Sequence, residues 1–91
     1  MEEAWIQVLK RWPQEIPREG IIVTSFGESI EFISYMLLGT VLLLERSKPD
    51  MQNARRVMVQ LGDVSMIKVT NPIEIERFKT FGFQVPTMAG S

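Results

Sequence analysis

The chain has 91 residues, ten basic and eleven acidic side chains, no histidine and no cysteine, and a formal net charge of −1. The absence of cysteine and histidine excludes disulfides, thiolate chemistry and the usual zinc sites, and the even charge excludes a general electrostatic attraction for nucleic acid. A domain of this size has a marginal core, so self-association is the remaining way to strengthen it.

The N-terminal segment predicts an amphipathic helix over residues 2–12. Acidic residues open this segment and basic residues close it, as the helix dipole favours, and Pro13 ends it. Because so short a helix is marginal in isolation, its apolar stripe has to cover either the core or an interface. The stripe consists of Trp5, Val8, Leu9 and Trp12, which share one face at helical spacing.

Beyond residue 20 the apolar residues alternate, which predicts strands within residues 20–70. Turn residues around Gly27, Gly39 and Gly62, and in the loop 47–54, divide this region into five strands. The run 41–44 is wholly apolar, so we expect it to be buried on both faces. The strands are expected at residues 21–26, 30–34, 41–46, 55–61 and 64–69.

The segment Asn71-Pro72-Ile73-Glu74 has the residues of a helix start: a cap residue, proline at the first helical position, and glutamate three residues after the cap. It predicts a short helix over residues 72–81 that Gly82 ends. The alternation of Ile73 and Ile75 leaves a sixth strand as the alternative. Residues 84–91 are expected to form a loose tail after a single domain of residues 1–83.

The most apolar stretch, residues 32–44, is thirteen residues long and includes Ser34, Gly39 and Thr40. A membrane-spanning helix needs about 20 apolar residues, and the acidic N-terminus is unlike that of a secretory signal. We therefore expect a cytoplasmic protein with no membrane partner.

One helix, five closely spaced strands and a short second helix predict a mainly β fold, a small, strongly bent, partly open five-stranded barrel. The sequence resembles the Sm-like (LSm, Hfq) family over about residues 5–70. Residues 56–67 are similar to the second motif of that family, in which Arg-Gly-Asp or Arg-Gly-Asn lies between two apolar strands. The first motif is matched more loosely by residues 20–32 and 41–45. The resemblance implies an SH3-like barrel, a homo-oligomeric ring of about five to seven copies, and single-stranded RNA as a ligand.

Two departures concern the RNA pocket of the resembling family. Its first motif carries an Asp and an Asn in an Asp-x-x-Met-Asn context, whereas residues 35–40 contain neither, and Leu61 stands where the second motif has Arg. In the family these residues shape the pocket for a base. Two functions therefore stay open: a ring that binds single-stranded RNA, and a structural or adaptor ring that mediates protein–protein contacts without RNA.

The strands on either side of Gly62-Asp63 are the candidates for subunit contacts. Neither contains proline, and residues 57–61 carry no charge, so nothing protects their edges from pairing with another strand. The alternative is that both are interior strands covered by the helices. The expected interface residues are Val57, Met58, Val59, Leu61, Val64, Met66 and Ile67.

The candidates for RNA contacts fall in two places. Tyr35 and Met36 are expected on the loop between the second and third strands, which faces the pore in the resembling family, and a tyrosine ring there can stack on a base. The alternative is a tyrosine that packs among apolar neighbours with its hydroxyl at the rim. In a ring, Lys48, Arg55 and Arg56 would form a positive collar for the phosphate backbone.

The basic collar has its own alternative, a solvated loop whose charge is partly neutralised by Asp50 and Glu45. Catalysis finds little support, because no histidine can act as a general base, the acidic residues are scattered, and no glycine-rich phosphate loop is present. The sequence therefore predicts a binding protein that is not an enzyme and has no metal or cofactor.

Overall fold

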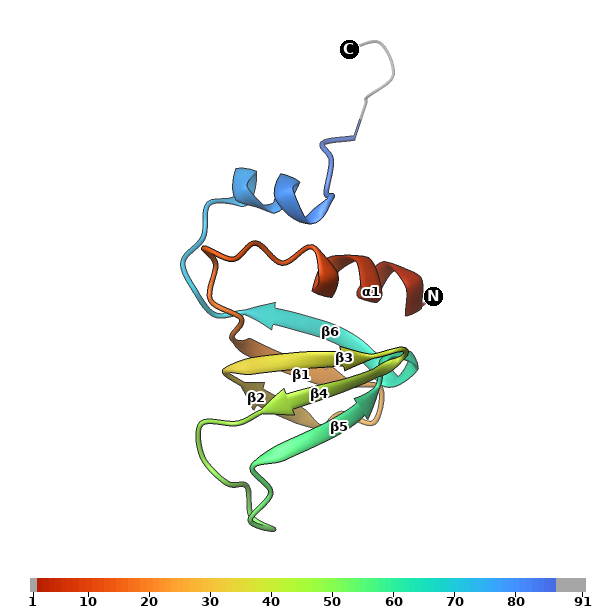
Figure 1. Cartoon of the computed structure of the whole chain (residues 1–91), viewed down its shortest axis with the longest axis vertical. Coiled ribbons are helices and arrows are strands. Elements are labelled where there is room, and N and C mark those ends of the chain that lie inside the picture. Colours follow the sequence, from red (N-terminus) through yellow and green to blue (C-terminus); the bar gives the residue numbers. More distant parts are fainter. Residues whose placement is uncertain (1, 87–91) are drawn as a thin grey trace.

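The structure is a computed structural model that describes residues 2–86. Within these residues an N-terminal helix precedes six strands, a single 3₁₀ turn joins the last two strands, and a longer 3₁₀ helix follows them (Figure 1). In chain order the elements are α1 (Glu2–Lys10), β1 (Gly20–Thr24), β2 (Ser29–Phe32), β3 (Ser34–Leu38), β4 (Val41–Glu45), β5 (Arg56–Gln60), η1 (Leu61–Asp63), β6 (Val64–Val69) and η2 (Ile75–Phe81).

The strands form two antiparallel three-stranded sheets, in the orders β2-β1-β6 and β3-β4-β5. The mainly β fold with an N-terminal helix is confirmed, but there are six strands among the described residues, and the prediction of five is wrong. The second predicted strand is divided at Ile33, whose N–H donates to the carbonyl of Glu45 at 2.8 Å. The alternation of buried residues slips there, because Phe32 and Tyr35 are both buried although three positions apart. Each half of this segment therefore pairs in a different sheet.

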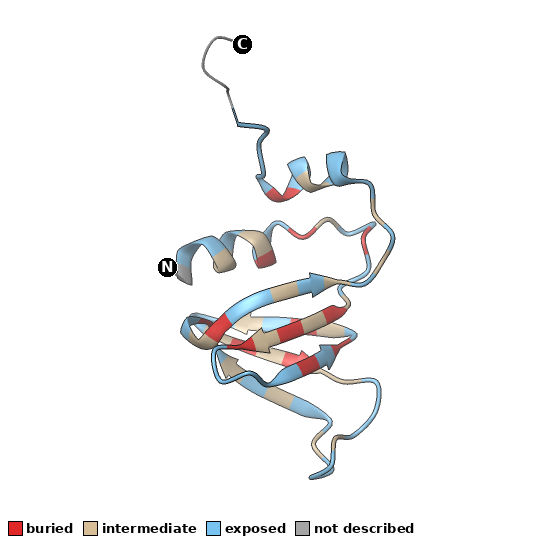
Figure 2. Cartoon of the chain, turned by 180° about the vertical axis from the view of Figure 1, so that it is seen from behind, coloured by how far each residue is buried: buried red, intermediate tan, exposed pale blue. Residues whose placement is uncertain are grey.

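The core lies between the two sheets and extends to the helices (Figure 2). Strand residues such as Ile22, Phe32 and Leu42 are almost completely buried, and so are Leu9 and Trp12 at the end of the helical segment. The predicted N-terminal helix is confirmed, although it ends at Lys10, two residues early. Its apolar stripe belongs to the core of this chain, with Trp5 and Val8 half-buried at its edge.

An aromatic cluster connects the helices to the second sheet. The Trp12 ring meets Tyr35 edge-on at 5.7 Å and Phe81 edge-on at 5.1 Å between ring centroids. Its indole N–H is shared between the carbonyls of Ile16 and Pro17, at 3.1 and 3.2 Å. The cluster therefore joins the end of α1, β3 and η2 with its polar group satisfied.

The predicted C-terminal helix is present in a different form. It is a 3₁₀ helix that begins at Ile75, three residues after the predicted start at residue 72. Asn71 does not cap it, because the helix begins four positions later, after Glu74. The side-chain amide of Asn71 instead donates to Glu19 Oε1 at 3.1 Å. Gly82 ends it in the left-handed conformation, at φ 109°, as predicted.

No strand forms at residues 73–75. Of the predicted tail, Gln84 to Pro86 are described as lacking helix or strand, and residues 87–91 lie outside the described part.

One glycine is required by close packing between strands. Gly20 begins β1, between Phe32 of β2 and Val69 of β6. A Cβ atom at this position would collide with the backbone carbonyl oxygen of Lys68 and lie 3.3 Å from the ring of Phe32. The absent side chain therefore allows the three strands to approach one another here.

Candidate interaction surface

The side of the β3-β4-β5 sheet that faces away from the core is apolar. Met36, Leu43 and Met58 are neighbours in register across the three strands, and Leu38 and Val41 form the adjacent row. Met36, Leu38 and Met58 are 69%, 81% and 75% exposed, whereas the alternate positions Tyr35, Leu42 and Leu44 are buried. We call this surface the outer sheet face: Ser34, Met36, Leu38, Val41, Leu43, Glu45, Arg56, Met58 and Gln60.

The outer sheet face corrects one expectation about burial. Residues 41–44 were expected to be buried on both faces, but only Leu42 and Leu44 are buried, while Val41 and Leu43 are half-buried on the outer side. Since an exposed apolar patch of this kind marks an interaction site in soluble proteins, this surface is the strongest candidate for function. The sequence signal for it was the run of apolar residues itself, which does not say which side is covered.

One end of the outer sheet face is polar. Ser34, Glu45 and Arg56 are neighbours in register there. Arg56 Nη2 lies 3.5 Å from Glu45 Oε2, and both side chains are largely exposed to solvent. Beside this pair is a hollow of about 170 Å³ lined by Ser34, Tyr35, Met36, Leu43, Glu45 and Arg56. It is smaller than the roughly 300–1,000 Å³ typical of small-molecule sites.

Three of the residues predicted to contact RNA, namely Tyr35, Met36 and Arg56, line this hollow together. The predicted position of Tyr35 and Met36 on a loop is wrong, because both belong to β3 and the turn follows at Gly39. Tyr35 is only 5% exposed, and its hydroxyl donates to the carbonyl of Leu9 at 2.6 Å. The tyrosine therefore joins β3 to α1 and leaves Met36 as the exposed member of the pair.

Burial raises the pKa of Tyr35 to about 12, with a smaller opposing effect from Arg18, whose guanidinium carbon lies 5.3 Å from the ring centroid. Because burial penalises the phenolate, the fold keeps its full stability below pH 10 and loses stability as the pH rises from about 10 to about 12. The loss on ionisation is about 2–3 kcal/mol, at 1.36 kcal/mol for each unit of pKa.

We expect Tyr35→Phe to lower the free energy of unfolding at neutral pH by about 1–3 kcal/mol, because the buried carbonyl of Leu9 loses its donor. The difference between the two proteins should narrow above pH 10, as the wild-type phenol ionises. The chain has a single tyrosine, so phenolate absorbance reports this group alone, and urea-unfolded chain provides the reference titration. Ionisation of the folded protein near pH 10 would contradict the buried hydrogen bond.

The basic candidates outside the hollow lie in the loop between β4 and β5. The N–H of Arg46 donates to the carbonyl of Arg55 at 2.9 Å, and its Nε donates to the carbonyl of Lys48 at 3.2 Å. Asp50 Oδ1 accepts the backbone N–H groups of Gln52 and Ala54, both at 2.8 Å. The acidic residue therefore holds the loop closed, while the side chains of Lys48 and Arg55 remain exposed.

The residues expected at the subunit interface fall into two groups, those packed in the core and those with exposed side chains. Leu61 and Val64 are buried, and Val57, Val59 and Ile67 pack partly against the core. Met58 and Met66 are the members with exposed side chains. Subunit contacts along these strands would therefore use the backbone edges and the two methionines. Among the described residues, β5 and β6 each have a hydrogen-bonded neighbour on one side only. Trp5 Nε1 donates to the carbonyl of Val64, the first residue of β6, at 3.1 Å.

Residues 2–86 contain no group of three or more aspartate or glutamate side chains arranged to hold a metal ion. None of the helices described is sufficiently long and apolar to span a bilayer. Comparisons with models of protein families, with curated proteins and with solved structures found no match.

Proposed function

We propose that this chain is the subunit of a homo-oligomeric, non-catalytic ring of the Sm-like kind, with about five to seven copies, that serves as a structural adaptor. Copies would be joined by pairing of β5 in one copy with β6 in the next. The observation that carries the proposal is that both strands are paired on one side only, while Val57-Met58-Val59 at the centre of β5 has no charge or proline to prevent pairing.

The order of the strands supports this family. If β2 and β3 are counted as one strand bent at Ile33, five strands follow one another as β6-β1-β2/β3-β4-β5. β5 and β6 are then the two ends of the series, connected by η1. The segment with the best resemblance to the Sm-like family, residues 56–67, covers the same two strands.

The adaptor role is supported by the chemistry of the outer sheet face. Its centre consists of methionine and leucine side chains, which suit contacts with protein. The one tyrosine of the chain is buried and presents no ring for stacking on a base. These features favour a protein partner over RNA.

Single-stranded RNA is the second candidate ligand, and the β4–β5 loop favours it. Lys48 and Arg55 are exposed on this loop, and Arg56 and Met36 line the hollow beside it. In a ring this basic group would be repeated in every copy, and phosphate contacts would be multiplied accordingly.

Assembly is tested by native mass spectrometry and by cysteine exchange, because the chain has no cysteine of its own. We expect a closed assembly of about five to seven copies. Mixed Met58→Cys and Met66→Cys chains should cross-link under mild oxidation much more than either variant alone. Met51→Cys, on a residue 97% exposed in the β4–β5 loop, is the control. A monomer at all concentrations would overturn the ring.

RNA binding is tested by fluorescence anisotropy with oligo-U and oligo-A at low and high salt. If RNA is a ligand, binding should be strongest at low salt and should weaken in a Lys48→Ala, Arg55→Ala double variant. Absence of binding at low salt would exclude RNA and leave the adaptor role.

A further inference from the structure

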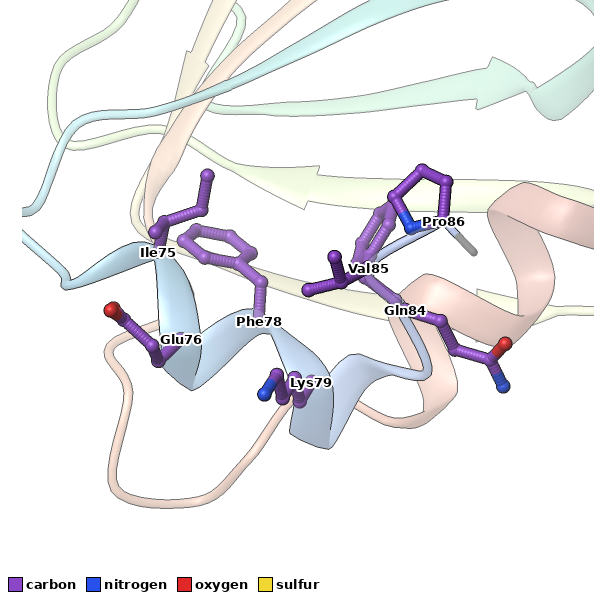
Figure 3. A pocket seen from close by; sticks show the side chains of 8 residues that line it. Ile75, Glu76, Phe78, Lys79, Gln84, Val85 and Pro86 are labelled. Carbon is purple, nitrogen blue, oxygen red and sulfur yellow. The ribbon is translucent and has the colours of Figure 1, made fainter. Parts of the chain in front are cut away.

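A second exposed apolar surface lies near the C-terminal end of the described residues. η2 and the residues after it form an open groove of about 620 Å³ whose apolar wall consists of Ile75, Phe78, Phe83, Val85 and Pro86 (Figure 3). Ile75, Phe83 and Val85 are 79%, 54% and 75% exposed. We call this surface the C-terminal groove.

One buried residue, Phe81, anchors the groove to the core. Phe81 is 3% exposed, and its ring contacts Trp12 at 5.1 Å and stacks on Phe78 at 5.1 Å. This anchor fixes η2 against the end of α1, and the ring of Phe83 also lies 6.4 Å from that of Phe78 and 6.5 Å from that of Phe81, between centroids. Ile75 and Val85 take no part in these ring contacts, and an apolar surface that stays exposed in this way marks an interaction site.

The groove and the outer sheet face have complementary rims. The rim of the groove carries Glu76 and Lys79, and neither forms an ion pair with another described residue. The polar end of the outer sheet face likewise carries one base and one acid, Arg56 and Glu45. The centres of both surfaces are apolar, so bringing them together can bury both centres and pair both rims.

The groove and one edge of the outer sheet face also lie far apart in the fold. η2 lies beside α1 on the side of β6, whereas β5, the edge strand of the outer sheet face, lies at the far side of the strands (Figure 1). A surface on one side that binds a different surface on the other joins identical copies head to tail. This polarity is the same as that of β5 pairing with β6 of the next copy.

We propose that the outer sheet face of each copy enters the C-terminal groove of the next copy, with Met36, Leu38 and Met58 in the groove and Arg56 facing Glu76. This inference rests on the proposed ring and assigns a second contact to it. The flexible methionine side chains can fill a groove of irregular shape. A groove of about 620 Å³ has room for several such side chains.

The test uses one substitution on each surface of the full chain, both at exposed residues away from the β5 and β6 edges: Met36→Asp on the face and Val85→Asp in the groove. Each variant alone should need at least about tenfold more protein to assemble, measured by sedimentation, because a charge is placed in an apolar contact. An equimolar mixture should form a one-to-one heterodimer by native mass spectrometry, since one variant retains the groove and the other retains the face. Met51→Asp, in the β4–β5 loop, is the matched control.

Charge reversal provides the second measurement. Glu76→Lys and Arg56→Glu should each weaken assembly, and their combination should restore a large part of it. Glu74→Lys makes the same change in charge outside the groove lining and should not rescue Arg56→Glu.

The outcomes separate this inference from the proposed ring. If Met58→Cys and Met66→Cys still cross-link while Met36→Asp and Val85→Asp assemble like the wild type, the ring stands and the groove contact is overturned. If Met36→Asp disrupts assembly and Val85→Asp does not, the outer sheet faces of two copies pack on each other, and the groove contact is overturned. A wild-type chain that stays monomeric would overturn both and assign the two surfaces to other proteins.

Discussion

Replacement of Trp12 by alanine is expected to lower the free energy of unfolding by about 3–5 kcal/mol. Trp12 is 3% exposed and touches both Tyr35 and Phe81. Its removal would leave a cavity where α1, β3 and η2 meet, and the carbonyls of Ile16 and Pro17 would lose their shared donor. The free energy of unfolding of a domain of this length is about 5–14 kcal/mol, so the substitution would remove a large part of it.

The measurement is urea unfolding followed by circular dichroism. Trp12→Phe provides a measurable second variant if the alanine variant does not fold, and it should lose less, because a ring remains in the cluster. Met51→Ala, at a residue 97% exposed, should change stability by less than about 0.5 kcal/mol. An unfolding midpoint of Trp12→Ala equal to that of the wild type would show that this cluster does not hold the helices to the sheets.

Leu42→Ala is expected to lower the free energy of unfolding by about 2–5 kcal/mol, and Leu38→Ala is expected to lower it by less than about 0.5 kcal/mol. The two leucines belong to the same β3–β4 hairpin, but Leu42 is 0% exposed and Leu38 is 81% exposed. The first substitution opens a cavity in the core, whereas the second removes atoms that already contact water. The pair therefore measures which side of the sheet is covered.

Urea unfolding of both variants under identical conditions tests this contrast at low protein concentration. A loss at Leu38 similar to that at Leu42 would mean that the outer sheet face is covered in the free chain. In that case the face would not be available to a second copy.

Local signals in the sequence were sufficient for several elements. The helical stripe of Trp5 to Trp12 and the stop at Pro13 predict α1, because 3.6-residue periodicity and proline act within one segment. The tight turns at Gly27 and Gly39 separate strands for the same reason, since each needs a positive φ that glycine adopts easily. Gly82 ends η2 in that conformation as well.

Other features depended on contacts between distant residues. The division at Ile33 arises because one extended segment pairs with β1 at its start and with β4 at its end. Asn71 was a plausible cap from its neighbours alone, but the helix begins at Ile75, and the Asn71 amide donates to Glu19, 52 positions away. Tyr35 was expected on a loop, and its bond to Leu9 closes a contact across 26 positions. None of these partners is visible in a local pattern.

The sequence by itself determined that this is a small, mainly β protein with an amphipathic helix at its start, because spacing, proline and glycine act through the nearest neighbours along the chain. Tertiary structure alone decided which face of each apolar strand is covered. In a run such as Leu42-Leu43-Leu44 both sides of the strand are equally apolar. Packing against α1 and the opposite sheet buries Leu42 and Leu44. Leu43 is left on the other side, beside Met36 and Met58. The outer sheet face, and with it the candidate contact between copies, follows from that choice.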